Sequence, residues 1–316
     1  MKKKINLIIC KTPLQVLIAE KIIDLYPNER FYGVMFPSVV NEKIEFYATR
    51  LKKKCNKFVF INNKVKLFII LLFFKFINIS LNNVFVASID CILPQLIISK
   101  NTFKKLLTFD DGTANIVGSG YFYNEKIGSK KVRFLKKIFK INKTMQDLKK
   151  ISTKHYTIYN EMPNIIDNTE FISLLPTDFS INKSIKKIKI FLGQPIFELK
   201  DGLSYEEKKN KNKKYTSKVI EEIGIDYYFP HPKEQYHIDN VDYIYSKFIF
   251  EDWILEQIRL NPTIKYEVYS FFSSVIFNIK DIPNVSVYSI KFNFDKWLNK
   301  EYELVNKFNI DIIDSF

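Results

Sequence analysis

The feature that most constrains this fold is a strand–helix–strand pattern that begins near the N-terminus. The run KINLIIC (4–10) has the apolar character of a buried strand, and PLQVLIAEKIIDLYP (13–27) places apolar residues at helical spacing between two prolines. RFYGVMF (30–36) follows as a second strand. Because a helix that joins two neighbouring strands leaves them parallel, the pattern predicts a parallel sheet whose loops gather at the carboxyl ends of its strands.

The same pattern starts again in the second half of the chain. IKKIKIFLGQP (185–195) and IDYYFPHPKEQ (225–235) are typical of strands, and SKFIFEDWILEQIRLNP (246–262) of an amphipathic helix. The 316 residues, 47% of them hydrophobic, suffice for two cores. We therefore predict an α/β fold with two Rossmann-like domains, residues 1–180 and 181–316. The glycine-rich fingerprints of dinucleotide and P-loop sites are absent from the sequence.

The charge of the chain points to anionic partners. The formal net charge is +15 and the pI is near 9.4, which suits anionic lipid headgroups, phosphorylated substrates or nucleic acid. Nucleic acid is not expected, because the sequence has no RNA-binding aromatic motif, zinc-finger spacing or basic zipper region. Cys10, Cys55 and Cys91 are far apart, as in a reduced, cytosolic protein without a structural zinc site.

The most apolar segment is LFIILLFF (67–74), which Lys66 and Lys75 flank. It is far shorter than the about 20 residues that cross a bilayer. The segment predicts a buried helix, with an apolar patch that faces a membrane as the alternative.

Two adjacent carboxylates, Asp110 and Asp111, end the predicted strand KKLLTFDD (104–111) and precede Gly112. In an open parallel sheet, this edge is where ligands bind. An Asp-rich turn before glycine is the ordinary explanation of the pair. If the two domains face one cleft, however, one of these carboxylates is placed to take a proton from an attacking hydroxyl.

Three polar features follow strands of the predicted C-terminal sheet: Gly193, His231 between two prolines, and the pair Ser273 and Ser274. If these strands are parallel neighbours, their loops converge at one edge, where hydroxyls, an imidazole and backbone amides can bind a phosphate. A turn or helix cap is the ordinary explanation of the serines. Glu251 is either an acid favoured at a helix start or a ligand of ribose hydroxyls.

Taken in order, TFDDGTANI (108–116), FLGQP (191–195), FPHPKEQY (229–236), FIFEDWIL (248–255) and YEVYSFFSS (266–274) resemble the bacterial sialyltransferases of glycosyltransferase family 52, typified by lipooligosaccharide α-2,3-sialyltransferases. The resemblance implies a GT-B arrangement, in which two Rossmann-like domains face a central cleft. It also implies an inverting transfer of N-acetylneuraminic acid from CMP-Neu5Ac to a terminal galactose hydroxyl. Neither a metal ion nor any cofactor besides this donor is expected.

The resemblance assigns roles to individual residues. His231 would hydrogen-bond or protonate the departing phosphate, and Glu251 would hold the ribose. The other expected donor-site residues are Gly193, Gln194, Pro195, Pro232, Ser273 and Ser274. The expected acceptor-side residues of the cleft are Thr12, Gln15, Gly112 and Thr113.

The catalytic base departs from the family pattern, in which an Asp directly follows the proline of the GQP segment. This chain has Ile196 at that position, with Glu198 two residues further on. The base is therefore expected to be Asp110 or Asp111, with Glu198 as the alternative.

The resemblance also implies partners and a location. Its acceptors are galactose-terminated bacterial surface glycans, assembled at the cytoplasmic face of the inner membrane, where a lysine-rich surface would give peripheral contact with anionic lipid. A homodimer is the expected assembly. Two other functions stay open: a different glycosyltransferase on the same fold, such as a hexosyltransferase, and a non-catalytic protein that binds glycans or lipid surfaces.

Overall fold

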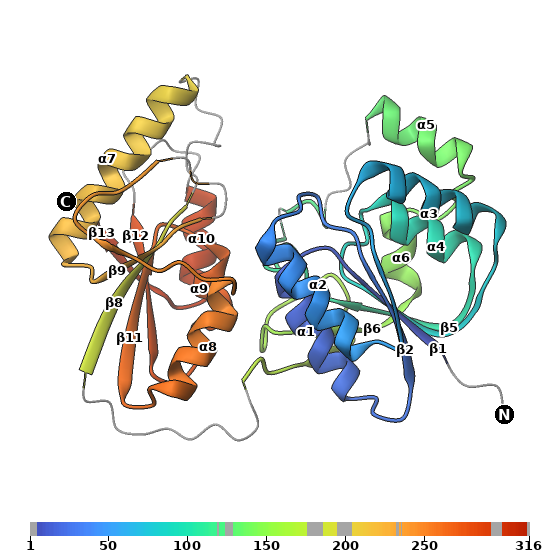
Figure 1. The fold of residues 1–316 in the computed structure, drawn as a ribbon, viewed down its shortest axis with the longest axis horizontal. Coiled ribbons are helices and arrows are strands. Elements are labelled where there is room, and N and C mark those ends of the chain that lie inside the picture. The colour runs from blue at the N-terminus through green and yellow to red at the C-terminus, as the bar shows by residue number, and fades with distance from the viewer. Residues whose placement is uncertain are drawn as a thin grey trace. The chain divides into compact units, whose positions relative to one another are not determined.

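The computed structural model describes residues 5–118, 120–123, 129–175, 186–194, 204–231, 234, 236–291 and 299–314. The chain divides into two compact units, Met1–Leu174 and Leu175–Phe316. Each unit is built around its own parallel sheet (Figure 1). The predicted pair of Rossmann-like domains is therefore confirmed, whereas the boundary predicted between residues 180 and 181 lies outside the described residues. The central cleft between the domains stays a prediction.

The N-terminal unit holds a seven-stranded parallel sheet with the strand order β3-β2-β1-β4-β5-β6-β7. Its strands are β1 (Ile5–Cys10), β2 (Arg30–Met35), β3 (Lys57–Phe60), β4 (Ser80–Val86), β5 (Thr102–Phe109), β6 (Ser152–Thr157) and β7 (Thr169–Phe171). Its helices are α1 (Pro13–Asp24), α2 (Glu42–Lys54), α3 (Lys64–Phe76), α4 (Ile92–Lys100), α5 (Lys130–Ile138) and α6 (Met145–Ile151). Figure 1 shows α1 and α2 on one face of this sheet and α3 and α4 on the other.

Local chemistry explains the first elements of this unit. β1 is the near-continuous apolar run that a strand covered on both faces requires, and residues 6–10 are all buried. α1 begins with Pro13 at its first position, where no backbone donor is needed. The Thr12 side chain accepts a hydrogen bond from the backbone N–H of Gln15 at 3.4 Å and so caps the helix. This cap fixes where α1 starts, and with it the position of Gln15 at the carboxyl edge of the sheet.

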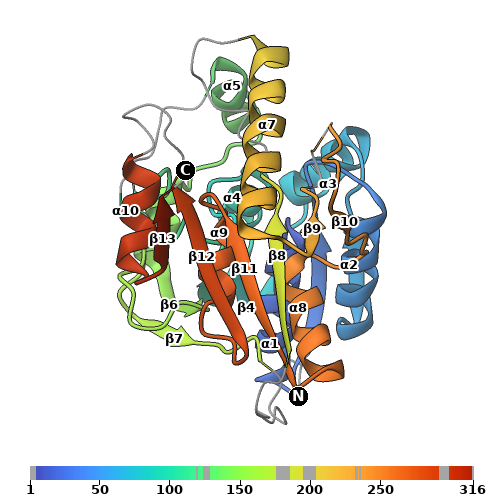
Figure 2. The ribbon, with the colours of Figure 1, turned by 90° about the vertical axis from the view of Figure 1, so that its left-hand side faces the viewer.

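The C-terminal unit holds a six-stranded parallel sheet with the order β10-β9-β8-β11-β12-β13. Its strands are β8 (Lys186–Leu192), β9 (Tyr227–Phe229), β10 (Asp242–Tyr243), β11 (Ile264–Ser270), β12 (Val285–Lys291) and β13 (Asp311–Asp314). Its helices are α7 (Tyr205–Ile223), α8 (Phe250–Leu260), α9 (Ser274–Ile279) and α10 (Asn299–Lys307). Figures 1 and 2 show α8 and α9 on one face and α7 on the other.

The segment 204–224, whose charge pattern suits either a helix or a loop, is a helix. A capping box between Ser204 and Glu207 begins α7, and Gly224 ends it with a φ of 67°. This left-handed conformation is why a glycine stands there. In both sheets the first strand of the unit lies centrally and the order reverses beside it. The reversal creates a switch point at β1/β4 and another at β8/β11, where ligands bind in folds of this type.

One prediction about burial is wrong. The apolar segment 67–74 does form a helix, α3, but only Leu71 and Phe74 of that helix are buried. Phe76 is 78% exposed and Ile69 is 57% exposed. α3 packs on the sheet along one narrow side, so an all-apolar sequence leaves apolar side chains on the outer side. Within the described residues, the structure has no helix with both the length and the apolar character needed to cross a bilayer.

The close packing of β2 yields a stability test. A Cβ atom at Gly33 would lie 2.7 Å from Cys55 Sγ and 3.0 Å from Phe58 Cδ2. Gly33→Ala is therefore expected to lower the free energy of unfolding by about 1–3 kcal/mol through overpacking, as measured by urea denaturation. Adding Cys55→Ala should recover part of the loss, because it removes the clashing sulfur.

Gly118→Ala is the matched control, because no atom lies within 4 Å of a Cβ built at that position. If Gly33→Ala proves as stable as Gly118→Ala, the packing of the Cys55 segment on β2 described above is incorrect.

Candidate active site

Gln15 occupies the switch point of the N-terminal sheet and is fully buried. Its side-chain oxygen accepts from the backbone N–H of Lys11, directly after β1, at 2.6 Å. Its side-chain nitrogen donates to Ser88 Oγ, after β4, at 3.0 Å, and to Asp111 Oδ1, after β5, at 2.5 Å. The Gln15 side-chain amide thus joins the carboxyl ends of three strands through hydrogen bonds, two of which it donates, to Ser88 and Asp111.

Asp111 is oriented from several directions. Ser88 Oγ donates to its Oδ2 at 3.0 Å, and its backbone N–H donates to Asn115 Oδ1 at 2.6 Å. Burial raises the pKa of the Asp111 carboxyl, while the hydrogen bonds from Gln15 and Ser88 oppose that rise. A carboxylate that is held in one orientation and has a raised pKa is suited to accept a proton.

Asp110 has a different environment, because neighbouring residues at a strand end point in opposite directions. It is fully buried, and both of its oxygens accept hydrogen bonds. Its Oδ2 accepts from Thr157 Oγ1 at 2.8 Å and from Ile158 N at 2.7 Å. Its Oδ1 lies 2.8 Å from His155 Nε2. These bonds join the end of β5 to the end of β6, so Asp110 is a structural anchor for this edge.

His155 is a hydrogen-bond partner of Asp110 that residue spacing along the sequence did not reveal. It is fully buried, and its Nδ1 lies 2.8 Å from Thr108 Oγ1, while its Nε2 faces Asp110. A signal was present in the sequence, because a histidine in a strand adjacent to the FDDG strand is placed to meet a carboxylate. Recognising it required the β5–β6 pairing, in which Thr108 and His155 are in register.

The remaining acceptor-side residues shape the loops at this edge. Thr12 caps α1. Gly112 has a φ of 64°, a left-handed conformation that favours glycine. The backbone carbonyl of Thr113 accepts from Ile116 N and Val117 N, both at 3.1 Å, which starts the turn that follows. Gly112 and Thr113 act through the backbone path that follows Asp111, whereas Thr12 acts on α1.

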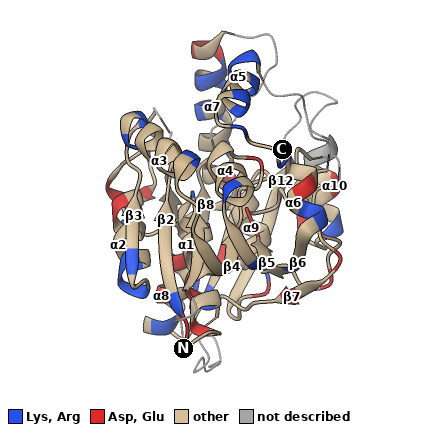
Figure 3. Ribbon diagram, turned by 90° about the vertical axis from the view of Figure 1, so that its right-hand side faces the viewer, with Lys and Arg blue, Asp and Glu red and all other residues tan. Residues whose placement is uncertain are grey.

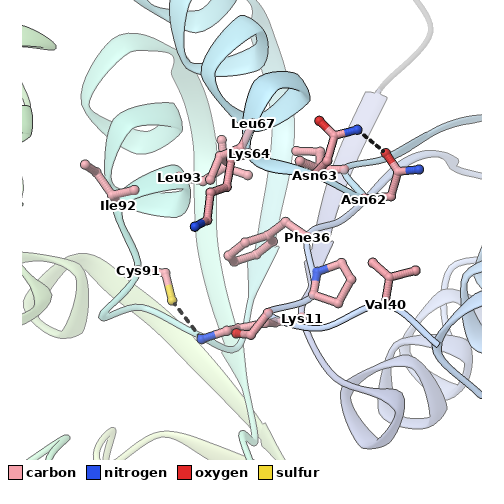
Figure 4. Close-up of a pocket in the computed structure, with 13 residues that line it drawn as sticks. Lys11, Phe36, Val40, Asn62, Asn63, Lys64, Leu67, Cys91, Ile92 and Leu93 are labelled. Carbon is pink, nitrogen blue, oxygen red and sulfur yellow. Dashed lines mark hydrogen bonds between the residues drawn. The ribbon is translucent and has the colours of Figure 1, made fainter.

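A pocket of about 480 Å³ opens at the same edge, over the ends of β1, β2 and β3 (Figure 4). Phe36 and Leu67 give it apolar walls, and Lys11 and Lys64 give it cationic ones. Lys11 also donates through Nζ to Cys91 Sγ at 3.5 Å. Because the backbone of Lys11 is bonded to Gln15, the pocket adjoins the network that holds Asp111.

The switch point of the C-terminal sheet repeats this construction with Gln194. Its side-chain oxygen accepts from Phe272 N at 3.1 Å and from Ser270 Oγ at 3.3 Å, which joins the ends of β8 and β11. Strands β9, β8 and β11 are parallel neighbours. Gly193, His231 and Ser273 therefore follow strands at one edge, as the sequence predicted.

Gly193 allows an unusually close approach of other groups. A Cβ atom there would lie 2.5 Å from Tyr228 Oη, 2.6 Å from Glu234 Oε2 and 2.9 Å from the backbone nitrogen of His231. Any larger residue would push the His231 segment away. Glycine is therefore required for the packing of this edge.

Glu234 is a residue that the sequence analysis missed, although it lies in FPHPKEQY. Tyr228 Oη donates to its Oε2 at 2.5 Å, and its backbone N–H donates to the carbonyl of His231 at 2.9 Å. Its Oε1 is buried and has no hydrogen-bond partner among the described residues. Burial raises the pKa of Glu234 to about 7, so the carboxyl beside His231 changes its charge near neutral pH.

Glu251 and the serine pair occupy the starts of helices. Glu251 is 4% exposed in the first turn of α8, and its Oε1 accepts from Asn278 Nδ2 at 2.8 Å. Ser273 is the N-cap of α9, where its Oγ accepts from Val275 N at 3.4 Å, and Ser274 is exposed beside it. The capping role is thus observed for Ser273. Pro195, Glu198 and Pro232 lie outside the described residues.

Comparisons with known proteins agree with the resemblance. The model of "Glycosyltransferase family 52" matches residues 28–294. The chain is 37% identical to a CMP-N-acetylneuraminate:beta-galactoside alpha-2,3-sialyltransferase of Pasteurella multocida (strain Pm70), over 98% of this chain and 99% of the relative. It is 36% identical to an N-acetyllactosaminide alpha-2,3-sialyltransferase of Haemophilus influenzae, over 92% of this chain and 94% of the relative.

Solved structures give a weaker likeness. The crystal structure of TcCGT1 in complex with UDP has a TM-score of 0.49 and 8% sequence identity, over 99% of this chain and 86% of that one. The family match, by contrast, covers most of the chain, and the two relatives cover nearly all of it. On this similarity, the chain belongs to glycosyltransferase family 52.

Proposed function

We propose that this protein is a sialyltransferase, which moves N-acetylneuraminic acid from CMP-Neu5Ac to a terminal galactose of a bacterial surface glycan. The names of its relatives support the donor, the galactose acceptor and an α-2,3 linkage. The observation that carries the mechanism is the Asp111 carboxylate, held by Gln15 and Ser88 at the switch point of the N-terminal sheet.

In the proposed reaction, Asp111 takes the proton of the acceptor hydroxyl. The hydroxyl oxygen forms a bond to the anomeric carbon as the bond from that carbon to the phosphate oxygen of CMP breaks. Because attack and departure occur on opposite sides, the configuration inverts. The shielding and orientation of Asp111 support this role, and the hydrogen bonds at both oxygens of Asp110 support a positioning role for that residue. Glu198 is the alternative base.

The C-terminal edge would hold the donor. His231 and the hydroxyls of Ser273 and Ser274 are proposed to meet the phosphate, where negative charge develops as CMP departs. A histidine can supply both a hydrogen bond and a proton near neutral pH. Glu251 is proposed to hold the ribose, and Gly193 to Pro195 to line the nucleotide site. The raised pKa of Glu234 supports this assignment, because the protonated acid does not repel the phosphate as an ionised carboxylate would.

The mechanism is proposed to need no divalent metal ion, since hydrogen-bond donors meet the leaving phosphate. We further propose that the enzyme works at the cytoplasmic face of the inner membrane, in peripheral contact with anionic lipid, and that it forms a homodimer. The basic charge of the chain supports the lipid contact.

The first test measures CMP release from CMP-Neu5Ac, with and without lactose and in excess EDTA, beside UDP-glucose and UDP-galactose. We expect lactose-dependent CMP release with a sialylated product and no turnover of the UDP sugars. Loss of activity in EDTA that Mg²⁺ or Mn²⁺ restores would contradict the metal-free mechanism. Turnover of a UDP sugar alone would indicate a hexosyltransferase. The absence of turnover with every donor would favour the non-catalytic protein that binds glycans or lipid surfaces.

Substitution of Asp111 is predicted to lower activity, and substitution of Asp110 to lower stability. Asp111→Asn should lower kcat at least about a hundredfold, the usual scale for a lost base, with the donor KM and the unfolding midpoint nearly unchanged. Asp110→Asn should instead lower the free energy of unfolding by about 3 kcal/mol, because it breaks a buried, fully bonded carboxylate network. Steady-state kinetics and urea denaturation of both variants separate the two effects. An active Asp111→Asn together with an inactive Glu198→Gln would move the base to Glu198.

The raised pKa of Glu234 leads us to predict that donor binding depends on pH. Its pKa of about 7 means that it becomes negative as the pH rises through neutrality, beside the proposed phosphate site. The donor KM is expected to rise at least about threefold from about pH 6 to about pH 8, and Glu234→Gln, which stays neutral, should flatten the rise. Because the folded-state pKa exceeds the unfolded value, Glu234 stabilises the fold below about pH 4.5, and this contribution is lost as the pH rises through about 7.

The control for this experiment is Glu221→Gln, which removes an exposed carboxyl of α7. It should keep the pH dependence of the wild type. If the donor KM of Glu234→Gln rises with pH as steeply as that of the wild type, Glu234 does not affect donor binding.

A further inference from the structure

A second pocket of the N-terminal unit lies toward the amino ends of its strands, on the opposite edge of the sheet from Asp111. We name it the amino-edge pocket, and the strand residues that line it include Asn82, Asn83, Lys104 and Lys105. Its volume is about 330 Å³, and small-molecule sites occupy about 300–1,000 Å³. Lys105 and Asp111 are separated by about 20 Å of extended chain, so this pocket is not part of the catalytic edge.

Three neighbouring strands supply one side of the pocket. Figure 3 shows β4, β5 and β6 side by side in the sheet. Asn83 of β4 pairs with Lys105 of β5, and Leu107 of β5 pairs with Lys154 of β6. Because Lys105 and Leu107 are two residues apart in one strand, these four side chains lie on the same face of the sheet. All four line the pocket.

Asn83 is the main indication that the amino-edge pocket binds a ligand. It is 8% exposed, and its backbone N–H donates to Asn6 Oδ1 at 3.1 Å. Its side-chain amide has no hydrogen-bond partner among the described residues. Asparagine is disfavoured in strands, so local structure does not account for it there. Since Asn83 lines the pocket, its amide can both donate to a ligand and accept from one.

Hydrogen bonds fix the wall beside this amide. Glu29 Oε2 accepts from Asn6 Nδ2 at 2.6 Å and from Asn82 Nδ2 at 3.4 Å, and Asn6 is fully buried. The ring of Tyr26 packs against Phe85 of β4, with centroids 5.5 Å apart. These contacts join the segment after α1 to β1 and β4. The pocket is therefore formed before any ligand arrives.

The charge of the lining favours an anion. Three lysines and one carboxylate, Glu29, line the pocket. Lys154 pairs with Glu170. Lys104 and Lys105 are exposed, and in the part of the chain that the structure describes neither forms an ion pair. Two cations are thus available to a negatively charged group beside the Asn83 amide.

These features together select one class of ligand. An inorganic anion would pair with the lysines but leave the Asn83 amide and the apolar side chain of Leu107 without a partner. A neutral sugar would bond the amide but leave Lys104 and Lys105 without a counter-ion. A sugar ring that carries a carboxylate has hydroxyls, a negative charge and apolar carbon–hydrogen groups, and so matches all of them.

We propose that the amino-edge pocket is a second carbohydrate site, which binds an acidic sugar. Its carboxylate meets Lys104 and Lys105, and its hydroxyls bond the Asn83 amide. Leu107 and the Tyr26 ring contact its apolar side. The ligand is a free acidic sugar or the acidic end of a glycan, which share this chemistry. The site is separate from the proposed reaction and does not depend on which sugar the enzyme transfers.

The test is an NMR titration of the full chain with N-acetylneuraminic acid and with sialyllactose, beside lactose and inorganic phosphate. Both acidic ligands should bind at least about tenfold more tightly than lactose and phosphate, because only they use the cations and the amide together. Tighter binding of the free acid would identify a free sugar as the ligand. Tighter binding of sialyllactose would identify the end of a glycan.

Two variants of the pocket separate charge from hydrogen bonding. Lys104→Glu with Lys105→Glu should raise the Kd for both acidic ligands at least about tenfold, and Asn83→Leu at least about fivefold. Because the Asn83 amide has no partner in the described protein, Asn83→Leu should also keep the urea unfolding midpoint of the wild type. A merely structural asparagine would not combine lost binding with unchanged stability.

Two controls complete the experiment. Lys130→Glu with Lys131→Glu makes the same charge change on two adjacent exposed lysines of α5, and should keep the Kd within about threefold of the wild type. Asp111→Asn should also keep the affinity for both acidic ligands, because it alters the opposite edge of the sheet.

Three results would overturn the proposal. The first is binding of lactose or phosphate as tight as that of the acidic sugars, and the second is wild-type affinity in either pocket variant. The third is a loss in Asp111→Asn or in the α5 control that equals the loss in the pocket variants. Because the titration contains no CMP donor, its failure is distinct from a failure of the proposed reaction.

Discussion

The hydrogen bonds of the buried Gln15 side-chain amide are the interaction on which the carboxyl edge of the N-terminal sheet depends. Strands β1, β4 and β5 end in loops that backbone pairing no longer holds together, and this single side chain joins all three through Lys11, Ser88 and Asp111. Gln194 joins β8 and β11 in the same manner. A primary amide suits the position because it donates and accepts at once without adding a charge that burial would penalise.

Burial acts differently on three carboxyl groups of this protein. Asp110 is buried with hydrogen-bond partners at both oxygens, so its charge is compensated and its role is structural. Asp111 is less deeply buried, and Gln15 and Ser88 each donate to one of its oxygens, so that burial raises its pKa while these two bonds oppose the rise. Glu234 has one tyrosine donor, and burial raises its pKa to about 7. The depth of burial and the hydrogen-bond partners of each group, and not its residue type, distinguish the three environments.

The outer helices of the N-terminal unit show a different use of apolar side chains. In β1, apolar residues are covered on both faces and hold the sheet together. In α3 the same residue types point in two directions: Leu71 and Phe74 are buried, and Leu67, Ile70 and Leu72 pack partly against the core, while the outer side chains are exposed. The outer side chains of α3, such as Ile69 and Phe76, are exposed together with Phe134 of α5, and lysines lie around them.

The sequence by itself determined the two parallel α/β units, because hydrophobic periodicity and proline positions are local and set strand ends directly. It also placed the aspartate pair at the carboxyl edge of the N-terminal sheet, and Gly193, His231 and Ser273 at the carboxyl edge of the C-terminal sheet. Only the tertiary structure decided which aspartate is the anchor, since the bonds from His155 to Asp110 and from Gln15 to Asp111 join residues 45 and 96 positions apart. It also decided the burial of Glu234 and the exposure of α3. Burial depends on what packs against a residue, and spacing along a chain does not record that.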